Sequence, residues 1–326
     1  MTFSLDNHWV WDFWIADDGE LFHLYYLHAP TSLGDPNLRH RNAIIGHATS
    51  ADLITWADRG PVIGPGRAGD ADATAAWTGS VVKDAADSWL MFYTGSRFLS
   101  PDRETNVESI ISASSTDLHH WTTSPVPSAA IDKRWYEVLG DGTWHEQAWR
   151  DPWVMRDPDG SGWHMLITAR ARSGPGSDTR DRGVIGHARS DDLVNWRVLP
   201  PLSEPGAGFA HLEVVQWCVI DGHPVVLFSC DTAHLAGDRA VGGAGGVWAV
   251  RAPAWGEQID VASASPVTGD ELYAARAIRN RRGEWMLMGF ENIGTNGAFV
   301  GRVSDPLPLQ WTPGGDLAIG SREAIR

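Results

Sequence analysis

The segment IIGHATSADLITW at residues 44–56 returns twice in related form further along the chain. The two later copies are IISASSTDLHHW at 110–121 and VIGHARSDDLVNW at 184–196. In each copy a serine is followed by Asp-Leu and, six residues after the serine, by a tryptophan. A degenerate fourth copy is SDPLPLQW, from Ser304 to Trp311. Repeats at this period indicate stacked structural units. The repeated aspartates are expected to belong to the scaffold; they are Asp52, Asp117 and Asp192.

Pairs of apolar segments joined by a turn signal accompany these repeats, and five such pairs can be counted along the chain. Asp18-Gly19, Asp159-Gly160 and Asp221-Gly222 mark turns between alternating runs, which is typical of β-hairpins. Helical signals are nearly absent, because no long run has a 3.6-residue period and 35 glycines and 19 prolines interrupt the sequence. Four-stranded units repeated around an axis form a β-propeller. We therefore predict an all-β fold, a five-bladed β-propeller with four-stranded antiparallel blades.

Length and composition favour one domain. The 326 residues are 43% hydrophobic, which is sufficient for a large core. We expect a single propeller over residues 1–326, without a C-terminal β-sandwich. The net charge of −15 disfavours nucleic acid and anionic membranes as partners. No apolar run is long enough to span a membrane and no secretory signal is visible, so a cytoplasmic location is expected.

The two cysteines are too few for a disulfide framework. A two-residue turn at Asp221-Gly222 places Cys218 opposite Val225 in the predicted hairpin. In the same register, Cys230 lies opposite Glu213. Since the cysteines do not face each other, we predict two free thiols.

The repeat also serves as a ruler for locating polar groups near the propeller axis. Each second strand has a core residue, and counting back 13 to 15 residues from it reaches the start of the innermost strand. The five positions reached are Asp12, Thr78, Asp151, Glu213 and Tyr273. Innermost strands run side by side around the axis and begin at the same face. The three carboxylates are therefore expected to converge at one end of the central channel.

Converging carboxylates are costly for a structural protein, because burial and like charges both disfavour their ionised forms. An enzyme that cleaves a glycosidic bond needs such a group, with one carboxyl protonated as an acid and another ionised as nucleophile or base. We therefore interpret Asp12, Asp151 and Glu213 as catalytic residues. The chemistry requires no cofactor. The 13 histidines show no zinc-binding spacing, so no metal is expected.

Tryptophan is unusually abundant, with 18 residues, and several of them flank the predicted carboxylates. Flat indoles can pack against the C–H faces of sugar rings. Polar residues nearby can bind sugar hydroxyls, and the expected ligand is a small-molecule carbohydrate. The predicted substrate-binding residues are Trp11, Trp14, Trp77, Ser80, Arg150, His211, Gln216 and Tyr273.

The order Asp, Arg-Asp-Pro, Glu along the chain resembles that of glycoside hydrolase families 32 and 68, the β-fructofuranosidase and levansucrase group. VWDFW at 10–14 is similar to the family 68 nucleophile segment. WRDPWV at 149–154 resembles the motif that carries the transition-state stabiliser in both families. WTGS at 77–80 and MFYTG at 91–95 resemble family 32 motifs of the second blade. The similarity extends over nearly the whole chain.

The resemblance implies a retaining double-displacement mechanism on a β-fructofuranoside or small fructo-oligosaccharide. Asp12 would be the nucleophile and Glu213 the acid/base. Asp151, with Arg150 beside it, would stabilise the transition state. In retaining enzymes the two reacting carboxyls lie about 5 to 5.5 Å apart. Transfer of fructose to another sugar is an alternative outcome of the same chemistry.

Two other functions remain open at this point. Family 43 uses the same five blades with Asp, Asp and Glu in corresponding places, but inverts and cleaves arabinofuranosides or xylosides. The chain lacks the Asn-Asp-Pro-Asn nucleophile segment of family 32, and Val214 follows Glu213 where that family usually has cysteine. A sugar-binding propeller without turnover is the third candidate. Loss of turnover on removing the Asp12 charge separates an enzyme from a lectin.

Overall fold

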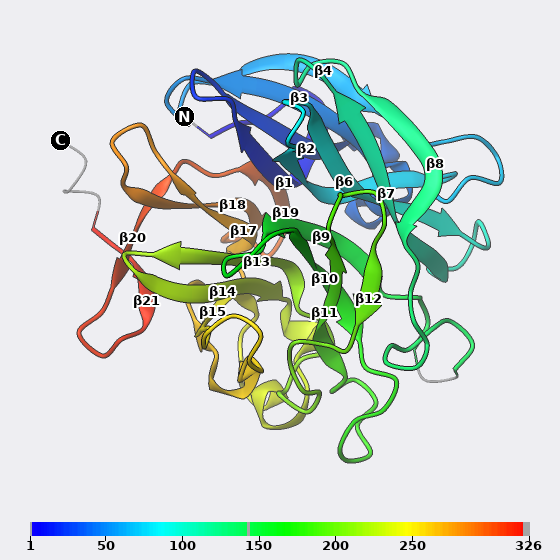
Figure 1. The fold of residues 1–326 in the computed structure, drawn as a ribbon, viewed down its shortest axis with the longest axis vertical. Helices are drawn as coiled ribbons and strands as arrows, with labels where there is room; N and C mark the ends of the chain where they lie inside the picture. The colour runs from blue at the N-terminus through cyan, green and yellow to red at the C-terminus, as the bar shows by residue number, and fades with distance from the viewer. Residues whose placement is uncertain (1, 142–143, 322–326) are drawn as a thin grey trace.

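The computed structural model describes residues 2–141 and 144–321, and in this part of the chain the strands form five antiparallel sheets. The sheets are arranged around a central axis like the blades of a propeller (Figure 1). Blade 1 contains β1 (His8–Asp17), β2 (Phe22–Pro30), β3 (Ile44–Ser50) and β4 (Ala57–Ile63). Blade 2 contains β5 (Ala75–Lys83), β6 (Trp89–Phe98), β7 (Asn106–Ser115) and β8 (Thr122–Ala129).

The other three blades follow in chain order. Blade 3 contains β9 (Trp149–Arg156), β10 (Trp163–Arg170), β11 (Gly183–Ser190) and β12 (Arg197–Leu199). Blade 4 contains β13 (Glu213–Ile220), β14 (His223–Cys230), β15 (Gly246–Arg251) and β16 (Ser265–Pro266). Blade 5 contains β17 (Leu272–Arg279), β18 (Trp285–Ile293), β19 (Phe299–Val303), β20 (Leu307–Trp311) and β21 (Leu317–Ile319). The predicted five-bladed all-β propeller is confirmed.

The helices in the described residues are short 3₁₀ turns between strands. They are η1 (Thr31–Leu33), η2 (Pro36–Asn42), η3 (Thr232–His234), η4 (Gly237–Ala240) and η5 (Val261–Ser263). No helix in this part of the chain has the length and apolar character needed to cross a membrane.

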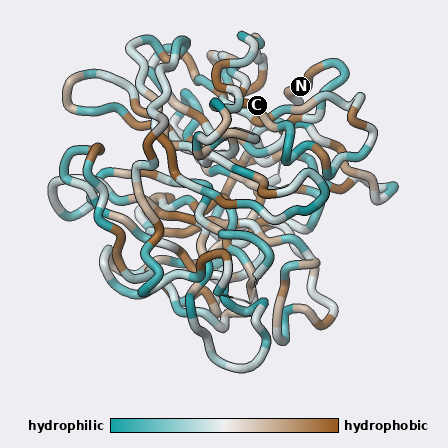
Figure 2. Tube along the Cα trace, turned by 90° about the vertical axis from the view of Figure 1, so that its right-hand side faces the viewer, coloured by the Kyte–Doolittle hydropathy of each residue, from teal (hydrophilic) through white to brown (hydrophobic). Residues whose placement is uncertain are grey.

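The innermost strands close the ring. In sequence order, β1, β5, β9, β13 and β17 each contact the next, and β17 contacts β1. Phe3 adds a second link, because its backbone pairs with that of Val303 in blade 5 through two hydrogen bonds of 3.0 and 2.9 Å. Figure 2 shows hydrophobic residues along the inner strands, whereas hydrophilic residues prevail in the outer loops. Apolar side chains also join neighbouring blades, since Phe92 of blade 2 and Val154 of blade 3 belong to one buried cluster.

The repeated segment forms the turn between the third and fourth strands of blades 1, 2 and 3. In blade 1, Asp52 Oδ1 accepts hydrogen bonds from the backbone N–H groups of Ile54 and Thr55 at 2.8 and 2.7 Å. Leu53 adopts a left-handed conformation, with φ 65°, and buries its side chain. Trp56 Nε1 donates to the Leu53 carbonyl at 3.1 Å. Asp117 and Asp192 make the same turn in the other blades, so the predicted scaffold role of these aspartates is confirmed.

The segment from Ser304 to Trp311 is not a fourth copy of this turn, contrary to the prediction. It lies within the third strand of blade 5, where residues 304–306 separate β19 from β20 and Trp311 ends β20. Pro306 explains the interruption, because proline cannot donate a hydrogen bond to the neighbouring strand.

The hairpin of β13 and β14 tests the predicted register. Asp221 and Gly222 form a two-residue turn with positive φ angles of 51° and 85°, and Cys218 pairs with Val225 as predicted. Ser229, however, lies opposite Glu213, so the predicted position of Cys230 was wrong by one residue. The reason is a bulge in β13, which adds a residue to one strand only. Both cysteines are free thiols, as predicted.

Candidate active site

The innermost strand of every blade is irregular at the same level. Register shifts relative to the second strand fall at Val10/Phe13, Trp77/Gly79, Arg150/Trp153, Glu213/Gln216 and Tyr273/Arg276. Such bulges bend a strand and re-aim its side chains, and they are frequent next to active sites. In three blades the bulge holds a non-glycine residue with positive φ: Asp151 (57°), Val214 (54°) and Ala274 (48°). Strain repeated at one level indicates a constrained, functional position.

All three predicted carboxylates lie at this level. The sequence alignment of the blades had predicted equivalent positions, but their positions relative to the bulges differ. Glu213 is the last paired residue before its bulge, since it pairs with Ser229. Asp151 is the first unpaired residue of the bulge in β9, and Asp12 is the second in β1. The ruler was therefore displaced by one residue between successive carboxylates, because spacing along the sequence does not reveal where each bulge places its extra residue.

Asp12 lies in the bulge of β1, one of the innermost strands of the propeller. Its Oδ2 accepts a hydrogen bond of 2.5 Å from the hydroxyl of Thr78, which joins blade 1 to blade 2. The residue is partly exposed to solvent, and many protein atoms lie around its carboxyl group. Burial, reinforced by the charges of Asp151 and Glu213, raises the pKa of Asp12 to about 7. Asp12 can therefore exchange a proton near neutral pH.

Asp151 is the most enclosed of the three, with 3% of the residue exposed. Its Oδ2 accepts hydrogen bonds from the Thr168 hydroxyl at 2.9 Å and the Val214 backbone N–H at 3.2 Å. Its own N–H donates to the Thr94 hydroxyl at 2.8 Å. Burial raises the pKa of Asp151 to about 6, although the nearby Arg150 guanidinium opposes this shift. The carboxylate is thus held in one orientation by groups from blades 3 and 4.

Glu213 is held by two donors, one on each carboxylate oxygen. Arg150 Nη2 donates to Oε1 at 2.5 Å, and the Tyr273 hydroxyl donates to Oε2 at 2.5 Å. The side chain is 22% exposed, so solvent and small ligands can reach it. Charge-assisted hydrogen bonds of this kind fix both position and orientation.

Arg150 is the centre of a buried polar network. Its Nη1 donates to Glu108 Oε1 at 3.0 Å and to Glu146 Oε1 at 3.1 Å. Its Nη2 shares a hydrogen bond of 2.9 Å with His211 Nδ1 in addition to the bond with Glu213. Because an arginine has no acceptor, this contact requires neutral His211 with its proton on Nε2. Although burial opposes it, the surrounding carboxylates raise the pKa of Arg150 well above its ordinary value.

The connection between β2 and β3 contains η2, which brings residues 39 and 40 close to the innermost strands β1 and β5. The Arg39 guanidinium lies 5.7 Å from the centre of the Trp11 ring, and its charge acts on Asp12. Trp77 Nε1 donates to the His40 carbonyl at 2.8 Å. Aromatic and polar groups therefore alternate around the carboxylates.

Three of the predicted substrate-binding side chains are placed elsewhere and hold the blades together. Ser80 donates to the Pro152 carbonyl at 2.7 Å and accepts from the Val154 N–H at 3.0 Å. Gln216 exchanges two hydrogen bonds with the backbone of Ala277, at 2.8 and 2.7 Å. Trp14 is fully buried in the core. Arg150, His211 and Tyr273 belong to the hydrogen-bond network around Glu213. Trp77 contacts η2, and Trp11 packs against Arg39 but is 2% exposed, like a core residue.

Sequence reasoning missed several polar groups of the site. Glu108 is a charged residue inside an apolar strand segment, NVESII. The same pattern identified Glu213, so Glu108 could have been predicted from the sequence. Glu146, Arg39 and His40 lie in connections between strands, whose paths no repeat indicates. Within the described residues, no group of three or more His, Cys, Asp and Glu side chains is arranged to hold a metal ion. The buried carboxylates are neutralised by a guanidinium instead.

Comparisons with solved structures agree with this architecture. The inulosucrase from Halalkalicoccus jeotgali bound to kestose superimposes with a TM-score of 0.77 at 21% identity, covering 97% of this chain and 87% of that one. A β-fructofuranosidase mutant of Microbacterium saccharophilum K-1 gives a TM-score of 0.75 at 15% identity, covering 100% and 76%. At these identities the likeness shows a shared fold.

Sequence comparisons extend the relation to a family. A β-fructofuranosidase of Arabidopsis thaliana, insoluble isoenzyme CWINV5, is 29% identical over 188 residues, which are 55% of this chain and 28% of that protein. The matched region thus spans about a quarter of the relative's length. The model of the glycosyl hydrolases family 32 N-terminal domain matches residues 14–297, most of the propeller. The chain therefore belongs to glycosyl hydrolase family 32.

Proposed function

We propose that this protein is a glycosidase that hydrolyses β-fructofuranosides by a retaining double displacement. The observation that carries the proposal is the convergence of Asp12, Asp151 and Glu213 at the bulges of three innermost strands, each held by its own hydrogen-bond donors. Membership of family 32 favours fructosides over the arabinofuranosides and xylosides of family 43.

In the first step, the Asp12 carboxylate attacks the anomeric carbon of the fructosyl group. Glu213 donates its proton to the oxygen of the leaving group, so that the carbon–oxygen bond breaks as the bond to Asp12 forms. In the second step, Glu213 accepts a proton from water, which attacks the same carbon and releases Asp12. Asp151, fixed by Thr168 and Val214, accepts hydrogen bonds from sugar hydroxyls and stabilises the positive charge of the transition state.

The mechanism requires one proton on the carboxylate cluster, and the raised pKa of Asp12 supplies it near neutral pH. Catalysis needs a proton on Glu213 and an ionised Asp12 when the substrate is bound. We propose that sugar hydroxyls that donate hydrogen bonds to Asp12 favour its ionised form.

The test is sugar release from sucrose, inulin-type and levan-type oligosaccharides and an aryl arabinofuranoside. Fructose released with initial retention of the anomeric configuration, followed by NMR, supports the proposal. Arabinose release with inversion contradicts it in favour of family 43 chemistry, and binding without turnover supports a lectin. Oligosaccharide products that accumulate at high sucrose concentration reveal transfer to sugar in competition with water.

A further inference from the structure

Trp135 is the most exposed of the 18 tryptophans, all of which lie in the described residues, with 41% of its surface accessible. Large aromatic side chains are usually buried or half-buried, because their apolar surface is unfavourable in water. An exposed indole that borders a cavity offers a flat aromatic surface to a ligand bound there.

The backbone of Trp135 is held in place. Its N–H donates to the Asp132 carbonyl at 3.0 Å, and its carbonyl accepts from the Arg172 N–H at 3.0 Å. The neighbouring Tyr136 forms an isolated β-bridge with Ala171. The indole is therefore carried on a preorganised segment, which lowers the entropic cost of binding a ligand to it.

A groove runs beside this indole between blades 3 and 4. It encloses about 510 Å³, within the range of roughly 300–1,000 Å³ typical of small-molecule sites. Pro200, Pro201 and Leu202 supply apolar wall. We call this cavity the Trp135 groove; its polar lining residues are Arg134, Arg172, Glu204, Glu257 and Gln258.

Three polar side chains of the groove are held by neighbouring groups. Arg134 forms a two-pronged ion pair with Asp132, with N–O distances of 2.6 to 3.1 Å. Arg172 Nη1 donates to the Lys133 carbonyl at 2.8 Å. Gln258 Nε2 donates to Glu204 at 2.9 Å. The groove is lined by two arginines and two glutamates, Arg134, Arg172, Glu204 and Glu257, so their formal charges balance. It therefore suits a neutral ligand with many hydroxyls better than an ionic one.

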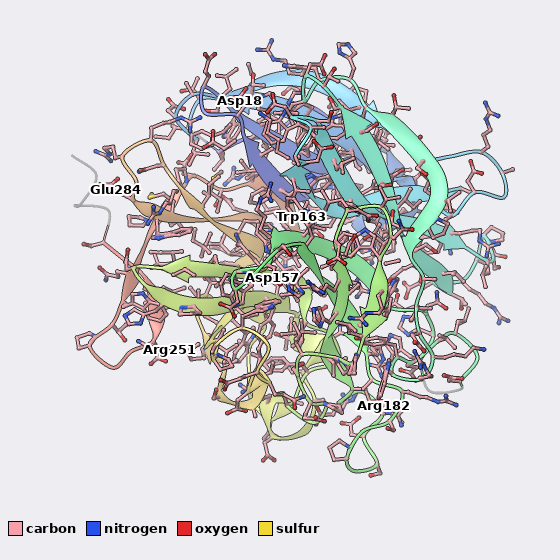
Figure 3. All side chains as sticks on the ribbon, in the orientation of Figure 1. Asp18, Asp157, Trp163, Arg182, Arg251 and Glu284 are labelled. Atoms are coloured by element: carbon pink, nitrogen blue, oxygen red, sulfur yellow. The ribbon has the colours of Figure 1, made fainter. Side chains whose placement is uncertain are left out.

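The Trp135 groove is connected to the wall of the active site. Two residues after Trp135, Glu137 forms a buried ion pair with Arg170 at 2.7 Å. The Arg170 guanidinium lies 3.9 Å from the centre of the Trp144 ring, and Trp144 contacts His211 edge to face at 5.3 Å. Arg182, labelled in Figure 3 at the outer edge of the molecule, lies 3.6 Å from Glu137. A continuous series of contacts thus links the segment that carries Trp135 to His211, which is a partner of Arg150.

We propose that the Trp135 groove is a second carbohydrate site, in which the indole stacks on a sugar ring of a neutral oligosaccharide chain. On the basis of the proposed function, we identify this oligosaccharide as a fructan. The groove would bind it at a place separate from the furanose at Asp12. Aromatic platforms flanked by planar polar side chains match the alternating apolar and hydroxyl faces of sugars.

Native electrophoresis in gels containing inulin, levan, arabinan or starch tests binding without requiring activity. Trp135→Ala is compared with the native chain, and Val194→Ala, an exposed apolar residue on blade 3 outside the groove, is the matched control. We expect fructan to retard the native chain and Val194→Ala, and to retard Trp135→Ala much less. Trp135→Tyr should recover part of the retardation. In kinetics, Trp135→Ala should raise KM for inulin about five- to tenfold and leave kcat/KM for sucrose unchanged.

Equal retardation of the native chain and Trp135→Ala, or none of either, overturns the second site. A loss of sucrose turnover in folded Trp135→Ala also overturns it, because the residue would then serve the catalytic centre. Trp135-dependent retardation by arabinan or starch supports the groove as a glycan site while contradicting fructan as its ligand. If the protein is inactive on every fructoside but is still retarded by a glycan in a Trp135-dependent manner, the proposed function is refuted and the second carbohydrate site is supported.

Discussion

The aspartates beside the innermost bulges and the aspartates of the outer turns have pKa values shifted in opposite directions. Burial raises the pKa of Asp12 to about 7 and that of Asp151 to about 6. In the turns, hydrogen bonds from backbone N–H groups hold the pKa of Asp192 well below its ordinary value. Partial burial raises the pKa of Asp52, but the backbone N–H groups of its own turn outweigh this effect, so the pKa is lowered.

The difference lies in what each region of the blade offers its aspartate. A turn supplies several N–H groups to one carboxylate that remains near water, so ionisation stabilises the fold. A bulge directs its side chain towards the axis, where two other carboxylates compete for few donors. In the turns, the ionised aspartates therefore stabilise the propeller. Near the axis, the clustered carboxylates do not stabilise the fold, which is typical of a functional site.

The largest expected contrast is in activity. Asp12→Asn should lower kcat/KM on sucrose by at least about 10⁴-fold, because the amide cannot form the covalent intermediate. Asp52→Asn, the matched change in a turn, should leave kcat/KM within about twofold, because the turn touches no substrate. Steady-state kinetics at pH 6.5 on both variants measure the contrast. Equal losses in the two variants would contradict the division into site and scaffold.

The second contrast is between two arginines. Arg150→Met should lower the free energy of unfolding by about 3–5 kcal/mol, because it leaves Glu108 and Glu146 buried without their cation. Arg180→Met, which breaks an exposed pair with Asp178, should produce no measurable change. Urea denaturation at pH 7.5 compares them. A stable Arg150→Met protein would show that the network does not depend on the guanidinium.

The smallest contrast is one of sign. Above pH 7 the folded protein carries an ionised Asp12 that burial disfavours, so the stability contributed by this group is lost as the pH rises through about 7. Asp12→Asn should therefore raise the free energy of unfolding at pH 8 by about 1–3 kcal/mol, a gain that fades as the pH falls towards 4. Asp52→Asn should lower it by about 1 kcal/mol at pH 8, because it weakens the turn. Two shifts of the same sign would contradict the comparison.

The architecture was predictable because the turn repeats carry their own chemistry. Ser50, Asp52 and Trp56 form a turn by local hydrogen bonds, so the same residues at the same spacing mark the same turn in other blades. The exception, residues 304–311, resembles the repeat in composition but contains Pro306, which interrupts a strand instead. Local chemistry therefore identifies the blades better than composition does.

The site was predictable only in outline. Carboxylates in innermost strands identified Asp12, Asp151 and Glu213, but their positions relative to the bulges differ by up to two residues. The partners of Arg150 come from a third strand and an inter-blade connection, as Glu108 and Glu146 illustrate. Such partners depend on how blades pack, and no local pattern in one sequence records that packing.

The most direct test of the central claim is to trap the covalent intermediate. Glu213→Gln lacks the base for the second step, and β-fructofuranosyl fluoride needs no acid for the first, so the fructosyl-enzyme should accumulate. Peptide mass mapping should locate one added hexosyl residue on Asp12, and Asp12→Asn in the same background should carry none. Attachment to another carboxylate, or turnover of the fluoride without any adduct and with inversion at the anomeric carbon, would contradict the assignment of Asp12 as the nucleophile.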